Sequence, residues 1–288
     1  IIDGHTAKSV RVIEDGDIRT IVEAVFEYAD STMCRRYYLS KTSSELKVCD
    51  KVYWNEKMKM LKVSVPTTIA CDYIGQAAYG SGKLLTNGEE MVSGKWNLVK
   101  DKDYALSVIN NGTHGSDCLD GEMRITLLRA PGYSAGKSDF SVRKPYIMEQ
   151  DRFSPFIDQG EHDFTFVFNA GNADERLEKI EREANAFAEE PFALSFFPIG
   201  CEKEKENTIK PFAELSDNAI TLAAFKKAER GEDFVLRLFN PTKTTRTTKL
   251  TMPAFGLCEE FALNPFEIAT YRINPGTKEV KKTDLMEK

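Results

Sequence analysis

The spacing of histidines and cysteines is the most specific sign of metal chemistry in a sequence, and this sequence has no pair at such a spacing. The three histidines, His5, His114 and His162, each lack a second His or Cys at the spacing of zinc ligands. The six cysteines are scattered, with no Cys-x-x-Cys pair, and several fall in strand-like patterns where a thiol behaves as a small hydrophobic group. We therefore expect no metal site within this chain, and reduced cysteines in a cytoplasmic protein.

Motifs for nucleophilic catalysis and phosphate binding are also missing from the sequence. It contains no Gly-x-Ser-x-Gly elbow, and no glycine loop of the phosphate-binding or dinucleotide-binding kind precedes a helix. The 45 Asp and Glu residues would allow a glycosidase pair, but the separation that defines such a pair cannot be read from a sequence. We expect the chain to hold no complete catalytic site of its own.

Two polar segments lie where strands are expected to end or to begin. Arg129 closes an apolar run that starts at Ile125, just before the turn at Pro131. It is either a solvated strand-end arginine or an arginine at a cleft rim, where its planar donors suit sugar hydroxyls. Asp158 and His162 come immediately before the next apolar strand, and they either stabilise a turn or point into a sugar-binding groove.

Composition and charge narrow the class of protein. The chain has 288 residues, 41% of them hydrophobic, so it can bury a sizeable core. Its net charge is −6 and no basic stripe interleaves with aromatics, which argues against nucleic-acid binding. No apolar run approaches the ~20 residues that span a bilayer, so no membrane partner is expected. The chain opens at Ile1 without an initiator methionine, and we expect it to be part of a longer protein.

Alternation of apolar and polar residues predicts a mostly β protein. Strands are expected in the first part of the chain around 22–28, 46–54, 57–65, 68–74, 104–110, 122–128 and 162–169. Between Met60 and Leu61 the apolar set changes phase, and a β-bulge is expected there. Tighter spacing predicts further strands at 219–225, 234–239, 247–252, 256–263 and 267–273, followed by a polar tail from Lys278 that is expected to fray.

One helix and two domains follow from the same patterns. Apolar residues recur at helical spacing from Leu177 to Phe187, which predicts a surface helix over about 173–189. Residues 1–200 are expected to form a large β-sandwich, with the helix included. A polar stretch around 200–208 separates it from a small C-terminal β-sandwich over 208–288.

The ordered set of these segments resembles a known family, the C-terminal β region of glycoside hydrolase family 38 α-mannosidases of the bacterial type. The stretches that carry the resemblance are Trp54–Val63, Tyr104–Asn110 with Gly115, Leu127–Pro131, Gln159–Phe164 and Phe234–Pro241.

The resemblance implies a mutarotase-like β-supersandwich and a cleft-lining role in mannoside hydrolysis by a retaining, metal-dependent enzyme. It implies that zinc and the catalytic acids belong to an N-terminal catalytic domain, which would be a partner of this chain together with mannose-containing glycans. Substrate-binding residues implied by the family's motifs are Arg129, Asp158 and His162, with no catalytic or metal-binding residue in this chain. Family members often have Arg where Gln159 stands, so no role is carried over to Gln159.

Other function classes stay open at this point. The chain is alternatively a stand-alone carbohydrate-binding module, in which Trp54 or Trp96 stacks on a sugar unless both pack in the core. A mutarotase-like epimerase would need His162 or His114 to meet a glutamate in one cleft. A structural role as packing surface or homo-oligomer interface is the remaining reading.

Overall fold

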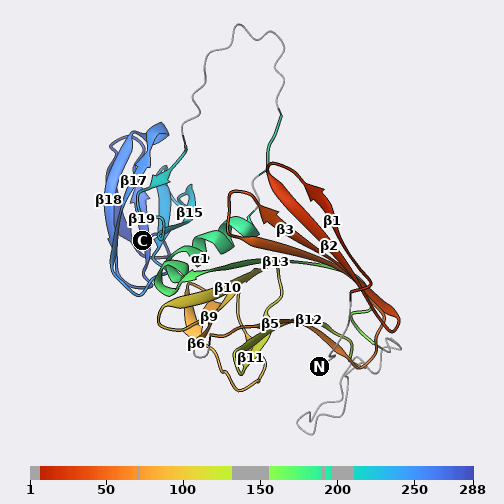
Figure 1. Cartoon of the computed structure of the whole chain (residues 1–288). Helices are drawn as coiled ribbons and strands as arrows, with labels where there is room; N and C mark the ends of the chain where they lie inside the picture. The colour runs from red at the N-terminus through yellow and green to blue at the C-terminus, as the bar shows by residue number, and fades with distance from the viewer. Residues whose placement is uncertain (1–6, 70–71, 132–155, 190–191, 196–210) are drawn as a thin grey trace, which may run out of the picture. The chain divides into compact units, whose positions relative to one another are not determined.

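A computed structural model describes residues 7–69, 72–131, 156–189, 192–195 and 211–288 (Figure 1). The chain divides into two compact units. Unit 1 comprises residues 1–75 and 83–173, and unit 2 comprises 76–82 and 174–288. The predicted boundary at 200–208 lies outside the described residues and stays a prediction. None of the helices in the described ranges has the length and apolarity that crossing a bilayer requires.

A nine-stranded antiparallel sheet dominates the N-terminal part of the chain. Its strands, in spatial order, are β1 (Ser9–Asp15), β2 (Arg19–Tyr28), β3 (Ser31–Ser40), β4 (Leu46–Trp54), β13 (Gly160–Asn172), β10 (Tyr104–Asn110), β9 (Trp96–Lys100), β6 (Asp72–Ala77) and β7 (Gly80–Lys83). Alternate residues of β4 point to the core, as the period-two pattern predicted, because successive side chains of a strand face opposite sides.

A four-stranded sheet faces the large one and closes the sandwich (Figure 1). Its spatial order is β5 (Met60–Pro66), β12 (Glu122–Arg129), β11 (Gly115–Leu119) and β8 (Met91–Val92). Apolar side chains from both sheets fill the space between them, among them Val48, Val52 and Trp54 of β4, Phe166 of β13, Val63 of β5, and Met123 and Ile125 of β12. The prediction of a mostly β, sandwich-type fold is confirmed.

The expected bulge exists, but the prediction placed it on the wrong strand. Along β5, Met60, Leu61 and Lys62 pair with Arg129, Leu128 and Thr126, so β5 itself inserts no residue. The extra residue is Leu127 of β12, which lies opposite the predicted position. The bulge lets both Leu127 and Leu128 be buried although they are neighbours in the sequence.

Unit 2 contains the α-helix and a small sandwich. Helix α1 (Ala173–Ala188) agrees with the predicted 173–189. The sandwich has one sheet of β14 (Glu214–Leu215), β17 (Arg246–Met252) and β18 (Leu257–Leu263), and another of β15 (Thr221–Lys227), β16 (Phe234–Phe239), β19 (Ile268–Ile273) and β20 (Val280–Thr283). A one-turn 3₁₀ helix, η2 (Pro253–Phe255), precedes β18. The expectation of a frayed tail is wrong, because β20 pairs with β19.

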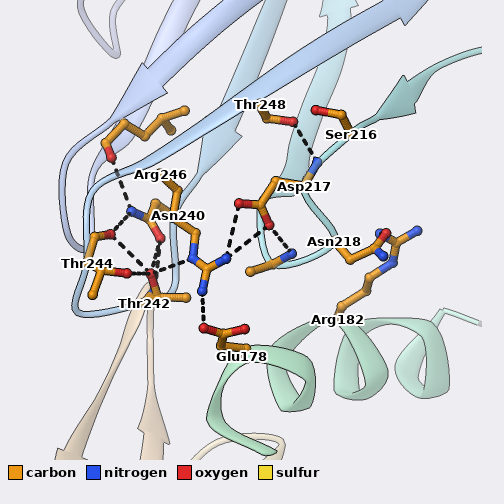
Figure 2. A network of polar contacts seen from close by, with 12 residues as sticks. Glu178, Arg182, Ser216, Asp217, Asn218, Asn240, Thr242, Thr244, Arg246 and Thr248 are labelled. Carbon is orange, nitrogen blue, oxygen red and sulfur yellow. Dashed lines mark hydrogen bonds and ion pairs between the residues drawn. The ribbon is translucent and has the colours of Figure 1, made fainter. Parts of the chain in front are cut away.

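An arginine of β17 connects the helix to this sandwich. Figure 2 shows Arg246 between α1 and the loops, where Nη1 donates to Asp217 Oδ2 at 3.2 Å and Nε to Thr242 Oγ1 at 3.2 Å. The guanidinium also pairs with Glu178 of α1. The fully buried Asn240 donates to the backbone carbonyl oxygens of Thr244, Leu263 and Asn264. The contacts therefore group α1 with the C-terminal strands.

Candidate functional site

The predicted site residues lie at one end of the unit 1 sandwich. At this end β4 stops at Trp54 and β13 starts at Gly160, and these two residues are paired. On the facing sheet β12 stops at Arg129, which is paired with Met60 at the start of β5. Asp158 immediately precedes β13, and His162 is the third residue of that strand. Strand ends from both sheets thus bring Arg129, Asp158 and His162 to one edge.

Asp158 is the residue that connects the three. Its carboxylate Oδ2 accepts from the backbone N–H of Arg129 at 3.4 Å, a long contact that leaves most of its accepting capacity unused. Its carbonyl oxygen lies 3.0 Å from Nε2 of His162. The His162 ring is in turn stacked with Phe164, with 6.1 Å between ring centroids. Within the described part of the chain, the exposed guanidinium of Arg129 has no ion-pair partner.

Gln159 stabilises the turn in which Asp158 stands. Its Nε2 donates to the carbonyl oxygens of Asn55, at 3.4 Å, and Glu56, at 3.3 Å, in the turn between β4 and β5. Asp158 (φ 57°) and Gly160 (φ 112°) both have left-handed backbone, which Asp tolerates and Gly favours. Gln159 therefore has a structural part here, although no role could be assigned to it from sequence.

A buried glutamate beside this turn was not predicted. Glu56 Oε1 accepts from the backbone N–H of Asp30 and from Ser31 Oγ, both at 3.1 Å, and Oε2 accepts from Lys59 Nζ at 2.8 Å. The hydrogen bond from Lys59 is the main reason why the pKa of Glu56 lies below its usual value. Glu56 thereby fastens the β2–β3 hairpin to the β4–β5 turn. The three-residue spacing of Glu56 and Lys59 was its only trace in the sequence.

A groove of about 570 Å³ extends from this end of the sandwich along β5 and β12, from Met60 to Glu122. Its lining comes from β2, β3, β4, β5, β11 and β12 and from the loop at Gly88; among the lining residues are Phe26, Tyr28, Met33, Trp54, Met60, Leu61, Lys62, Asp117 and Arg124. None of Arg129, Asp158 and His162 lines it. Trp54 and Trp96 are 2% and 3% exposed, so both pack in the core rather than present a free face for stacking.

An ion-paired cluster occupies the polar part of the groove. Asp117, with a side chain 2% exposed, accepts from Arg124 through Oδ1 and pairs with Lys62 through Oδ2. Lys62 also pairs with Glu90. Lys62 and Arg124 project from the side of their strands opposite to the buried Val63 and Ile125, as strand alternation requires. Asp117 can be buried as an anion because two cations flank it.

The potential metal ligands of the described residues are dispersed. In those ranges, no group of three or more His, Cys, Asp or Glu side chains is arranged to hold a metal ion. The described residues therefore do not fit a zinc site, and no step of a reaction is assigned to a metal there.

The chain is similar to known proteins in sequence and in fold. Residues 3–137 match the model of the glycosyl hydrolases family 38 C-terminal domain. Alpha-mannosidase G of Dictyostelium discoideum is 22% identical over 305 residues, which cover 91% of this chain and 26% of that protein.

Two solved structures from Enterococcus faecalis share the fold. One is an α-mannosidase and the other a glycosyl hydrolase family 38 protein, with TM-scores of 0.73 and 0.74, each at 17% identity. Each alignment covers 94% of this chain, but only 35% and 37% of those chains. The chain thus spans about a quarter to just over a third of the length of these relatives. The resemblance found from the motifs is confirmed: residues 3–137 match the glycosyl hydrolases family 38 C-terminal domain, and the chain is similar to part of family 38 α-mannosidases.

Proposed function

We propose that this chain is the accessory part of an α-mannosidase-like glycoside hydrolase, in which an N-terminal catalytic domain cleaves the O-glycosyl bond. In this proposal the strand-end site of Arg129, Asp158 and His162 lines one side of the sugar cleft. The observation that carries it is the exposed guanidinium of Arg129, which has no partner among the described residues although it stands beside a largely unused carboxylate.

The contacts of each of the three residues support a specific role in binding a sugar. The planar donors of Arg129 suit two neighbouring sugar hydroxyls at once. The Asp158 carboxylate, held by a single long hydrogen bond, accepts from a further hydroxyl. His162 contacts the Asp158 carbonyl and stacks with Phe164, so it positions the turn. The three groups bind and orient a substrate, and no bond-breaking step is assigned to them.

The remaining features of the whole enzyme belong to the same proposal. Mannose-containing glycans are the substrates that the relatives' names suggest. Zinc is assigned to the catalytic domain upstream, because the donor set of the described residues does not fit it. A cytoplasmic location and a homo-oligomeric state are also proposed on the basis of the sequence alone.

Hydrolysis of an aryl α-mannoside tests the proposal directly. The 288-residue chain is expected to be inactive with added zinc or cobalt, whereas the polypeptide that also carries its upstream sequence is expected to be active. Turnover by the purified chain alone would contradict the proposal, and so would an inactive, folded and zinc-loaded longer polypeptide. Both proteins should be checked for folding by circular dichroism before the assay.

The epimerase alternative finds no support in the geometry. Neither His114 nor His162 lines the groove of unit 1. His114 Nδ1 lies 3.4 Å from the carbonyl oxygen of Gly94, and His162 contacts the Asp158 carbonyl. Neither contact pairs an imidazole with a glutamate, as acid–base catalysis on a sugar ring would require.

A further inference from the structure

We propose that the groove of unit 1 is itself a binding site for a neutral saccharide. The groove is the cavity that opens beside the ends of β2 and β4 and is lined by Tyr28, Trp54, Lys62, Asp117 and Arg124, among other residues. Its volume of about 570 Å³ lies within the ~300–1,000 Å³ of small-molecule sites and leaves room for one or two sugar rings.

The charges of the groove indicate an uncharged ligand. Two cations, Lys62 and Arg124, and three carboxylates, Glu27, Asp117 and Glu122, line it. Both cations are already ion-paired with the buried Asp117. An anion would therefore meet no surplus of positive charge and would have to disrupt an existing pair.

Donors and acceptors remain after these pairs are formed. Arg124 uses Nε and Nη2 for Asp117, and in the described ranges its Nη1 has no partner. Lys62 uses two of its three protons, for Glu90 and Asp117. Glu122 accepts from Ser64 through Oε1 at 2.5 Å and has a second oxygen to offer. Fixed donors and acceptors side by side are what the hydroxyls of a sugar require.

The same groove is also lined by apolar side chains. Phe26, Tyr28 and Met33 are only partly buried, and Met60 is 43% exposed. Such side chains pack against the C–H face of a sugar ring, while the polar cluster takes its hydroxyls. Lys59 Nζ donates to the Tyr28 hydroxyl at 2.9 Å and to Glu56 Oε2 at 2.8 Å, so the position of the Tyr28 ring is pre-organised.

That the saccharide is a mannoside rests on the proposed function, whereas the ability of the groove to bind sugar hydroxyls rests on its own side chains. The proposed function and this inference can therefore be tested separately. An active longer polypeptide without a ligand in the groove would contradict this inference alone. Binding in the groove by a chain whose longer form is inactive would contradict the proposed function alone.

Methyl NMR of the full 288-residue chain tests the inference. Methionines labelled at the methyl carbon report on the groove at Met33 and Met60, while the fully buried Met252 of unit 2 is the internal reference. Titration with methyl α-mannoside and an α-linked mannobiose to millimolar concentrations is expected to shift the first two signals saturably and to leave Met252 unchanged.

Two variants and a control make the result specific. Arg124→Lys keeps the positive charge beside Asp117 but removes the planar donors, and is expected to weaken binding by about tenfold. Phe26→Leu keeps an apolar side chain and removes the ring, and should also weaken binding. Arg19→Lys makes the same chemical change at an exposed residue outside the groove and should leave the affinity unchanged.

Three outcomes would overturn the inference. The first is that the Met33 and Met60 signals do not shift at millimolar sugar in the folded chain. The second is that Arg124→Lys and Phe26→Leu both bind the sugar with the same affinity as the wild type. The third is tighter binding of a sulfated or aminated sugar, or of an extended apolar peptide, than of the neutral saccharide.

Discussion

The pKa of a single side chain in this protein depends on the charged groups that contact it, and Glu23 of β2 shows the effect most clearly. Its side chain is 5% exposed and accepts from Arg11 Nε at 3.0 Å and from Arg36 Nε at 2.9 Å. The hydrogen bonds from Arg11 and Arg36 lower the pKa of Glu23 from 4.5 to about 2. Burial acts in the opposite direction but is outweighed. The carboxylate is thus favoured in the folded state.

A pH dependence of stability follows from the pKa of Glu23. Because the folded pKa is lower than the unfolded one, the stabilisation is present above pH 4.5 and is lost as the pH falls towards 2. Glu23→Gln should therefore flatten the fall in the free energy of unfolding across this range, as measured by urea unfolding at several pH values. Glu259→Gln, at an exposed residue, is the matched control. Equal slopes for wild type and Glu23→Gln would contradict the prediction.

Arg129 is the residue whose loss should affect the activity of the whole enzyme most. Hydrogen bonds from a charged donor contribute about 1.5–3 kcal/mol, so Arg129→Ala should lower kcat/KM for a mannoside by roughly 10- to 100-fold. Arg129→Lys should recover only part of this, since one ammonium replaces two parallel donors. Steady-state kinetics of the longer polypeptide give the measurement. An unchanged kcat/KM in Arg129→Ala would remove Arg129 from the proposed site.

At the scale of the element, alternation predicted the strands that have one polar face. The predicted range 46–54 coincides with β4, in which every second residue from Val48 to Trp54 is buried. The prediction missed β9 and β11 because consecutive residues of each strand are buried, so no alternation is visible. Several of these buried residues are polar: Asn97 donates to Tyr73 and Ser116, and accepts from Ser93. A polar residue in a buried network looks like a loop residue in sequence.

The sequence predicted the position of the site residues only because they stand next to strand ends, which the alternation pattern reveals. Arg129, Asp158 and His162 were placed correctly beside strand ends, and antiparallel pairing then brought those ends together. The groove was not predictable, because its lining comes from six strands and from a loop at Gly88. The displaced bulge has a similar cause: a phase change in β5 does not tell which of two paired strands carries the extra residue.

Close packing within β6 gives a prediction at this scale. A Cβ on Gly75 would lie 2.7 Å from Leu84 Cδ1 and 2.7 Å from Ser93 Cβ. Leu84 can move, but Ser93 Cβ is fixed to the backbone, so Gly75→Ala should destabilise the protein by about 1–3 kcal/mol. Gly82→Ala is the control, since nothing lies within 4 Å of the added carbon. Thermal unfolding compares the two, and equal melting temperatures would contradict the argument.

At the scale of the whole molecule, the two compact units are not two consecutive pieces of chain. Residues 76–82 belong to unit 2 although they lie between two stretches of unit 1. Within unit 2, Gln76 Nε2 donates to both carboxylate oxygens of Glu181 at 2.8 Å. Tyr79 packs edge-on against Phe239, with 5.4 Å between ring centroids. A cut at residue 173 would therefore remove part of the second unit.

This interleaving predicts how a C-terminal fragment behaves. A fragment of residues 174–288 keeps α1 and the small sandwich but loses Gln76 and Tyr79, including the donor to the nearly buried Glu181. We expect it to fold with a stability about 1–3 kcal/mol below that of the same unit in the whole chain, because a charge-assisted hydrogen bond and an aromatic contact are lost.

Gln76→Ala in the whole chain should reproduce part of this loss, whereas Thr277→Ala, at an exposed turn, should not. Urea unfolding followed by hydrogen exchange at β16 and β17 separates the second unit from the first. A fragment as stable as the unit in the intact chain would show that residues 76–82 contribute nothing to it.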